Sequence, residues 1–415
     1  MFGKNLLRDL FLPIIFAATA ILEACSGTSP TTLPTPNTQS TATATAEATP
    51  TKEEAQKIKS EIGINAQKSV FAVYLDWFGQ SKWTDWAHWE WTGKMPHNPR
   101  NFIAADQRDI ASINYPLVGP YRSDDPKLIR YHTRLAKSIG IDALVVDWYT
   151  YKDTPNTDLA YMDKNFSRMI NIAEEEDYNL SVLMEPKIHF NGWIPHGSRK
   201  ESVKAVEDDF RHVLKNYSER KGFFKQDKLP VMFVYETWRL TPEEWNYVVE
   251  DLEKEGHYFV LVGDVTDPKY LGPFSSLYEW PNYDGVAKEG DSYHNHVLQN
   301  LGKTIGKRKD VVPSASVWPG FNDTGVWGWG DGPRILDRKD GDFYQTTWNA
   351  ALNNNPRWLA VATFNDWNEG TQIEPSRENG YEYLRQTSEY IGRFKGMKID
   401  PAAAVRLTKE YINSR

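Results

Sequence analysis

One stretch of the sequence, Ala143-Leu144-Val145-Val146-Asp147-Trp148, shows the unit from which the fold is built. Its apolar residues are typical of a buried β-strand, and it ends in a carboxylate and an aromatic ring. The preceding residues, Pro126–Gly140, have the apolar spacing of a helix. Seven more runs resemble this strand: Val70–Trp77, Leu180–Glu185, Val231–Glu236, Tyr258–Asp264, Ser276–Trp280, Val311–Val317 and Trp358–Asp366.

Helical spacing follows most of these runs, and Thr241-Pro242-Glu243-Glu244 is a clear helix start with a capping residue. Only Pro268–Leu271 is available after the fifth run. Alternating strands and helices indicate a parallel sheet with helices outside, and eight such units predict a (β/α)8 TIM-type barrel. A doubly wound open sheet is the alternative, although no nucleotide-binding glycine motif supports it. The other helices are expected at Lys164–Asn179, Val203–Arg220, Pro242–Glu255, His296–Lys309, Tyr344–Asn354 and Tyr383–Phe394.

Acidic residues stand at or near the ends of seven of the eight runs. In a barrel the carboxyl ends of the strands open on one face, so these acids gather there. The long segment Gln80–Asp124 follows the first strand and is expected over the same face, where it could wall a cleft. These acids are Asp76, Asp147, Glu185, Glu236, Asp264, Glu279 and Asp366.

The candidate chemistry lies in Asn365-Asp366-Trp367-Asn368-Glu369, directly after the last strand. Asp366 and Glu369 reach one pocket only if the chain leaves the strand near Asp366, and Gly370 makes that turn possible. Two carboxylates among aromatic rings are the usual equipment for glycoside cleavage, one protonated and one ionised. An Asp and a Glu three residues apart also occur as ordinary charged residues on protein surfaces.

Composition narrows the function classes further. The 415 residues carry 48 basic and 56 acidic side chains, and this net charge of −8 disfavours nucleic-acid binding. Tryptophan, tyrosine and phenylalanine make up 13% of the chain, which suits sugar binding or an aromatic-rich core. No zinc or calcium motif is present, so no metal and no cofactor are expected. Trp327-Gly328-Trp329-Gly330 is either a sugar platform or a packed turn.

The first 67 residues have the composition of a targeting segment and a tether. Lys4 and Arg8 precede the apolar run Leu10–Leu22, which is short for a membrane span, and Cys25 is the only cysteine. We therefore expect a bacterial lipoprotein signal over residues 1–25 with Cys25 lipidated; a plain signal peptide is the alternative. Residues 26–67 are interpreted as a low-complexity linker rich in Ser, Thr, Pro and Ala. The hydrolase domain is expected over residues 68–415, on an exported, membrane-anchored protein at the cell surface or periplasmic side.

The chain resembles glycoside hydrolase family 99, the endo-α-mannosidase and endo-α-mannanase group. The most specific match is Phe364–Pro375, where the family has NEWHEGTQIEP at the positions of Asn365–Pro375, in the same order and length. The resemblance implies the (β/α)8 fold and retaining hydrolysis within α-mannan-like glycans. The other matching segments are Tyr74–Gly79, Tyr115–Tyr121, Asp147–Tyr149, Met184–Pro186 and Trp318–Thr324.

The same resemblance implies roles for single residues. Asp366 takes the position of the base that acts on the 2-hydroxyl of the substrate, and Glu369 that of the general acid. Asp366 replaces the glutamate of the family and is shorter by on the order of 1.5 Å, while Asn368 replaces its histidine. The candidate substrate-binding residues are Tyr74, Trp77, Trp148, Tyr149, Glu185, Tyr278, Trp280, Asp323 and Asn365.

Two other functions stay open at this point. One is hydrolysis of a different α-glycan, such as an α-1,3-glucan. The other is glycan binding without catalysis by a surface lipoprotein.

Overall fold

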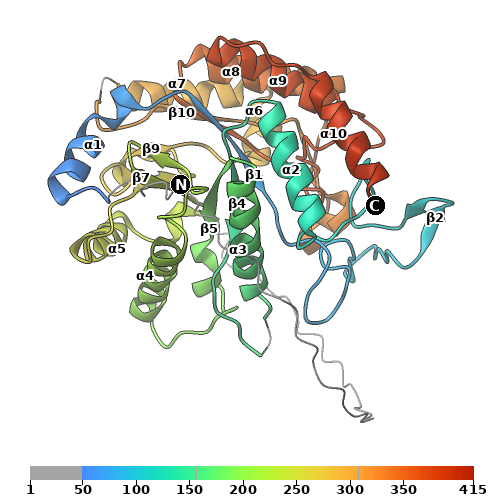
Figure 1. The fold of residues 1–415 in the computed structure, drawn as a ribbon, viewed down its shortest axis with the longest axis horizontal. Helices are drawn as coiled ribbons and strands as arrows, with labels where there is room; N and C mark the ends of the chain where they lie inside the picture. The colour runs from blue at the N-terminus through green and yellow to red at the C-terminus, as the bar shows by residue number, and fades with distance from the viewer. Residues whose placement is uncertain (1–48, 156, 307) are drawn as a thin grey trace, which may run out of the picture. The chain divides into compact units, whose positions relative to one another are not determined.

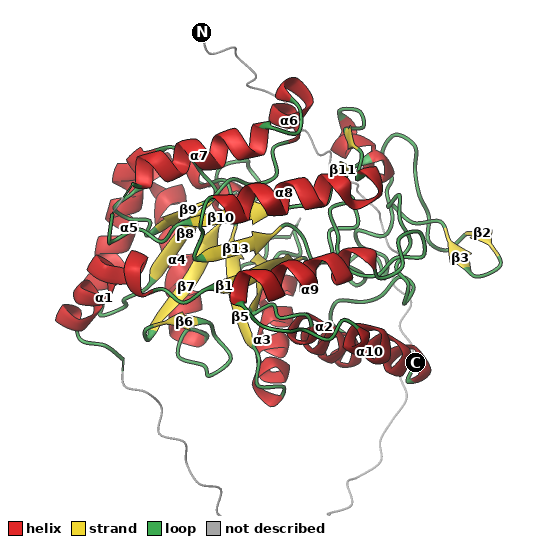
Figure 2. Ribbon diagram, turned by 90° about the horizontal axis from the view of Figure 1, so that it is seen from above, coloured by secondary structure: helices red, strands yellow, loops and turns green. Residues whose placement is uncertain are grey.

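The computed structural model describes residues 49–155, 157–306 and 308–415, which form eight parallel strands surrounded by helices (Figure 1, Figure 2). This arrangement confirms the predicted (β/α)8 barrel. The predicted signal, Cys25 and most of the predicted linker lie outside the described residues. The strand order is β10 (Ser314–Val317), β13 (Trp358–Val361), β1 (Ser69–Tyr74), β4 (Ala143–Trp148), β5 (Asn179–Met184), β7 (Leu229–Val234), β8 (Val260–Gly263) and β9 (Ser276–Leu277).

Side chains join the two ends of this strand order. The Ser276 and Ser314 hydroxyls lie 2.8 Å apart, and the Ser314 hydroxyl also donates to the Leu277 carbonyl at 2.8 Å. These contacts bring β9 to β10, so the barrel is nearly closed. Strand β9 needs these contacts because it pairs with β8 over only two residues.

The apolar strand runs are explained by burial on both faces. Every residue of β1, β4 and β7 is buried, as expected when helices cover a parallel sheet. Inside the barrel, the Phe71 ring packs edge-on against Phe233 from the opposite wall and against Trp358. Aromatic packing therefore fills the interior and leaves the strand ends as the place for a site.

The helices follow the predicted alternation. The capping box of Thr241 and Glu244 opens α5 as expected, and the interval after β8 holds only the short turn η3 (Pro268–Tyr270). Three helices, α1 (Lys52–Asn65), α6 and α10, were not predicted. The helices are α2 (Pro126–Ser138), α3 (Ala160–Glu175), α4 (Arg199–Asn216), α5 (Pro242–Lys254), α6 (Tyr283–Glu289), α7 (Tyr293–Ile305), α8 (Asp342–Asn353), α9 (Glu382–Lys395) and α10 (Ala402–Asn413).

The predicted linker extends too far along the chain. Residues Lys52–Asn65 form helix α1, which begins with a capping box at Thr51 and buries Ala55 and Ile62. The Gly63 N–H donates to the Lys309 carbonyl, and the compact unit begins at Pro50 rather than at residue 68. Because α1 buries so few apolar side chains, its sequence lacks a clear helical stripe.

Among the described residues, five short strands lie in addition to the eight strands of the barrel. The segment after β1 carries the hairpin of β2 (Phe102–Ala104) and β3 (Gln107–Arg108), which projects from the body (Figure 1, Figure 2). Strands β11 (Phe321–Asn322) and β12 (Ile335–Leu336) form a second hairpin, and β6 (Lys225–Gln226) pairs with β7. None of the helices in the described ranges has the length and apolar character that crossing a membrane requires.

Candidate active site

A cleft with a volume of about 430 Å³ opens where the carboxyl ends of several strands meet. Glu236 follows β7, Asp264 follows β8, Glu279 follows β9, and Glu369 comes from the loop after β13. Acids from separate strand ends therefore gather on one face, as the sequence predicted. The insertion Gln80–Asp124 packs on this face but contributes none of the described residues that line the cleft.

The loop after β13 is held by a short ladder of its own. The Thr363 N–H donates to the Thr371 carbonyl at 3.1 Å, and the Ile373 N–H donates back to the Thr363 carbonyl at 3.1 Å. Strand β13 ends at Val361, and the Phe364 N–H makes a last bond to the Val73 carbonyl of β1 at 2.7 Å, so the chain leaves the sheet just before Asp366. This departure is what the sequence required for two carboxylates three residues apart to share a pocket.

Gly370 makes the tight turn of this loop possible. Its φ is +62°, and a Cβ atom would lie 2.8 Å from the Asn322 carbonyl oxygen. The Asn322 N–H in turn donates to the Glu369 carbonyl at 2.7 Å, which docks the loop on β11. Only glycine fits this left-handed position against another backbone.

Glu369 lies in the wall of the cleft, and Asp366 is buried next to it, outside the described residues that line the cleft. Asp366 is 4% exposed, and its Oδ1 accepts the Glu369 backbone N–H at 3.0 Å. The Glu369 side chain is 21% exposed and lines the cleft. Its Oε1 accepts the indole N–H of Trp329 at 3.0 Å and lies 4.0 Å from Nη2 of Arg334.

Burial acts on both carboxyls. It raises the pKa of Asp366 well above its ordinary value, and the charge of Glu369 raises it further. Burial also raises the pKa of Glu369, whereas Arg334 and the Trp329 hydrogen bond oppose that rise. The two neighbouring carboxyls therefore titrate as a pair.

Of three predicted rings, one lines the cleft. Trp280 is in the cleft wall and packs edge-on against Tyr235 at 4.9 Å between ring centroids. Trp77 lies edge-on to Trp329 at 6.5 Å, and Tyr149 lies edge-on to Trp77 at 6.5 Å. These two rings are not among the described residues that line the cleft, and Trp329 connects them to Glu369.

Glu185 lies in a second acidic pair beside the first. It is 6% exposed, and Nζ of Lys187 lies 2.8 Å from its Oε2. Asp147 is fully buried, neither of its carboxyl oxygens has a hydrogen-bond partner among the described residues, and burial and the neighbouring Glu185 raise its pKa well above its ordinary value. The Lys187 ammonium also lies 5.0 Å from the Tyr235 ring, which lines the cleft.

Two of the predicted substrate-binding residues, Tyr74 and Trp148, point away from the site. The Tyr74 hydroxyl lies 2.9 Å from Nδ1 of His132 on α2, and Tyr74 is fully buried. The Trp148 indole N–H donates to Asp163 on α3 at 3.2 Å, and its ring stacks on His212 of α4. Both lie between barrel and helices, so their assignment to the sugar site is wrong. Side chains alternate along a strand, and these two take the outward positions.

Replacing Trp148 therefore tests this placement. We expect Trp148→Ala to lower the free energy of unfolding by about 3–5 kcal/mol, because it leaves a cavity between β4 and its helices. Urea unfolding measures this loss. The matched variant Trp280→Ala removes a half-buried cleft ring and should weaken glycan binding more than stability. A normal unfolding midpoint for Trp148→Ala with lost glycan affinity would restore the original assignment.

Three further candidate substrate-binding residues do not line the cleft but pack against or hydrogen-bond residues near it. Tyr278 is fully buried and packs edge-on against Phe233 inside the barrel. The Asp323 carboxylate accepts from the Arg334 backbone at 2.6 Å and from its Nε at 2.7 Å. The Asn365 amide bonds both polar groups of the Leu75 backbone, at 2.8 and 2.9 Å. None of the three is among the described residues that line the cleft, and their substrate contacts stay predictions.

Asn368, at the position of the family histidine, connects the loop to the insertion. Its Nδ2 donates to the His88 carbonyl at 2.8 Å and the Ala111 carbonyl at 2.9 Å. The His88 ring stacks on Trp77 at 4.3 Å. The insertion therefore supports the candidate catalytic loop from outside.

Sequence reasoning did not assign Tyr235, Lys187 or Arg334 to the site, and it named Asp147 only as one of the acids at the strand ends. Tyr235 and Lys187 come one and three residues after strands β7 and β5, a position that could have drawn attention to them. Arg334 carries no such signal. The sequence left open whether Trp329 belongs to a sugar platform or to a packed turn. In the structure it lies in a tight turn and donates its indole N–H to Glu369.

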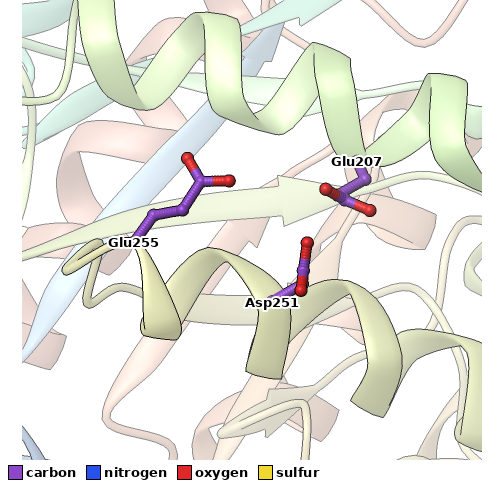
Figure 3. Close-up of side chains that lie close together, drawn as sticks. All are labelled: Glu207, Asp251 and Glu255. Atoms are coloured by element: carbon purple, nitrogen blue, oxygen red, sulfur yellow. The ribbon is translucent and has the colours of Figure 1, made fainter.

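Among the described residues, one group of carboxylates away from the cleft has the spacing of a metal site: Glu207 on α4, Asp251 on α5 and Glu255 directly after α5 (Figure 3). Arg211 bridges the group, with Nη2 2.7 Å from Glu255 and in contact with Glu207. This guanidinium joins the two helices and offsets part of the negative charge, so the cluster has a structural explanation.

Comparisons with known proteins agree on one family. Residues 65–391 match the model of glycosyl hydrolase family 99. The human glycoprotein endo-alpha-1,2-mannosidase-like protein is 25% identical over 341 residues, which cover 75% of this chain and 69% of that protein. The rat glycoprotein endo-alpha-1,2-mannosidase is 24% identical over 344 residues, covering 76% and 70%. The GH99 endo-alpha-mannosidase structure from Bacteroides thetaiotaomicron shares the fold, with a TM-score of 0.61, 20% identity and coverage of 80% and 98%.

Proposed function

Because the chain belongs to glycosyl hydrolase family 99 and is a glycoside hydrolase, we propose that it cleaves internal α-mannosidic bonds of a glycan with retention of configuration. The observation that carries this proposal is the position of Glu369 in the cleft wall, with the Asp366 carboxylate accepting its backbone N–H at 3.0 Å. The names of its mammalian relatives, endo-alpha-1,2-mannosidases, support α-mannosides as the substrate class.

In the proposed mechanism Glu369 is the general acid and Asp366 the base. Asp366 takes the proton of the 2-hydroxyl of the substrate while that oxygen attacks C1, and Glu369 gives its proton to the departing glycosidic oxygen. A 1,2-anhydro sugar results. Water then attacks C1 and passes a proton to Glu369, while O2 takes its proton back from Asp366. Two inversions at C1 leave the configuration retained.

The resting protonation of the site bears on this cycle. The productive state has the proton on Glu369 and not on Asp366, whereas burial raises the pKa of both carboxyls. The proposed cycle therefore requires the 2-hydroxyl of the substrate to stabilise ionised Asp366 on binding.

Product analysis tests the substrate class. The purified protein is incubated with a panel of α-mannans and α-glucans, and the fragments and their anomeric configuration are read by NMR. We expect fragments with retained configuration from an α-mannan. Release from α-1,3-glucan alone would favour the second candidate substrate, and retention on a mannan affinity gel without cleavage would favour a binding protein.

We propose further that Cys25 anchors the protein to a membrane on the outer side of the cell. The support is sequence alone: a charged start, an apolar run and a single cysteine. Acyl chains add about 0.8 kcal/mol of membrane affinity per buried CH₂. We expect Cys25→Ala to move the protein from the membrane fraction to the soluble fraction, as measured by fractionation and immunoblotting. A variant that stays membrane-bound would contradict the anchor.

A further inference from the structure

The hydrogen bond between Trp329 and Glu369 has only one possible direction. The indole nitrogen carries one hydrogen and accepts nothing, so Oε1 of Glu369 is the acceptor at 3.0 Å whether the carboxyl is charged or neutral. Arg334, 4.0 Å from the same oxygen, also has only donors. Two donor groups thus face Oε1, and a proton on that oxygen would have no acceptor there.

We propose that Trp329 is a positioning residue that confines the acidic proton of Glu369 to Oε2. This inference rests on the proposed role of Glu369 as general acid. A carboxyl that keeps its proton on one oxygen presents it in one direction, toward the glycosidic oxygen in the cleft. Without the indole N–H the proton is shared between two oxygens, and the carboxyl is free to rotate about its terminal bond.

The surroundings of Trp329 fix this geometry. Its ring packs edge-on against Trp77 and against Trp91, at 6.5 and 6.0 Å between ring centroids. The backbone adopts left-handed conformations at Trp327, Gly328 and Trp329, with φ of +48°, +59° and +56°. Such conformations are disfavoured for residues with a Cβ, persist where tertiary contacts enforce them, and cluster at functional sites.

Asp323 holds both the turn that carries Trp329 and the side chain of Arg334. The Asp323 carbonyl accepts the Gly328 N–H at 3.0 Å, while the Asp323 carboxylate holds the Arg334 side chain at 2.7 Å. Asp323 is fully buried, and these contacts occupy it. One residue therefore places both donors on the same oxygen of Glu369, which explains its position in the site without any substrate contact.

The indole N–H also acts on the charge of Glu369. A donor to the carboxylate stabilises the ionised form, so the hydrogen bond lowers the pKa of Glu369 against the effect of burial. The ionised form is the state that exists after the proton has reached the leaving group. Trp329 therefore both aims the proton and stabilises the carboxylate left behind.

The test is Trp329→Phe, which keeps an aromatic ring and removes the N–H. On an unactivated α-mannan we expect kcat to fall by about tenfold or more, because a small misplacement of the proton donor strongly lowers the rate of the chemical step. On an aryl mannoside with a good leaving group, which needs no protonation, kcat should change far less. The pH optimum of kcat/KM should move to higher pH, because loss of the donor raises the pKa of Glu369.

Trp327→Phe is the matched control. It makes the same change two residues away in the same left-handed run, where the ring contacts Lys94 rather than Glu369. Its pH optimum should equal that of the wild type. A Trp329→Phe enzyme that melts normally but keeps the wild-type pH optimum and loses both substrate types equally would overturn the inference. If instead the wild-type enzyme cleaved no glycan, the proposed function itself would fail.

A second measurement covers the case in which Trp329→Phe does not fold. In ¹⁵N-labelled wild-type protein, one tryptophan indole N–H signal should shift as Glu369 titrates. Glu369→Gln should abolish that shift and leave the other indole signals in place. Indole signals with identical pH behaviour in both proteins would contradict the contact.

Discussion

Glu369→Gln should abolish the cleavage of unactivated glycans. The amide cannot donate an acidic proton, and general acid groups typically contribute about 10²–10⁴-fold to the rate. Binding should remain measurable, because the amide keeps the shape of the side chain and can still accept the indole N–H of Trp329. Steady-state rates on an α-mannan and affinity by calorimetry give the two quantities.

The leaving group separates this role from a structural one. An aryl mannoside whose phenol leaves without protonation should lose much less rate in Glu369→Gln than the natural glycan does. Glu236→Gln is a suitable control, since Glu236 also lines the cleft but is paired with Arg239 at 2.6 Å. We expect a much smaller loss there. An equal loss on both substrate types in Glu369→Gln would exclude Glu369 as the acid.

Asp366→Asn should impair both substrate types. The base takes the 2-hydroxyl proton whichever group leaves, so a good leaving group cannot compensate, and we expect a loss of about 10²–10⁴-fold. The side-chain amide oxygen of this variant can still accept the Glu369 backbone N–H, which keeps the loop in place. Rates on an aryl mannoside and on a mannan, with melting temperatures as the folding check, measure the effect.

The variant Asp366→Glu tests whether the site is adapted to aspartate in place of the glutamate of the family. Asp366 is almost fully buried, and its Oδ1 is engaged by the loop backbone. Asp366→Glu restores the reach of the family glutamate by about 1.5 Å. A higher mannanase rate in this variant would mean that the chain has drifted from the chemistry of the family. Full activity in Asp366→Asn on any glycan would exclude Asp366 as the base, and inactivity of the wild type on every glycan that it binds would favour a binding protein.

The sequence by itself determined the barrel. Strands buried on both faces must be apolar along their length, so runs such as Ala143–Trp148 are recognisable without any tertiary information. The capping box of α5 is equally local. Acids at the strand ends located the site as well, because all parallel strands of a barrel end on one face.

Only the tertiary structure decided which side chains enter the site. Asp147 and Trp148 are neighbours with opposite directions, and which one faces inward depends on how the strand packs against the helices. The start of the domain was misplaced because α1 buries only two apolar residues.

The partners of the two carboxyls were also beyond the sequence. Trp329 meets Glu369 across 40 residues, and Asn365 meets Leu75 across 290. Desolvation of Asp366 likewise comes from segments that are distant in the chain. Periodicity and capping act between neighbours along the chain, whereas hydrogen-bond partners and burial arise when distant segments meet, so the chemistry of the site was fixed only by the fold.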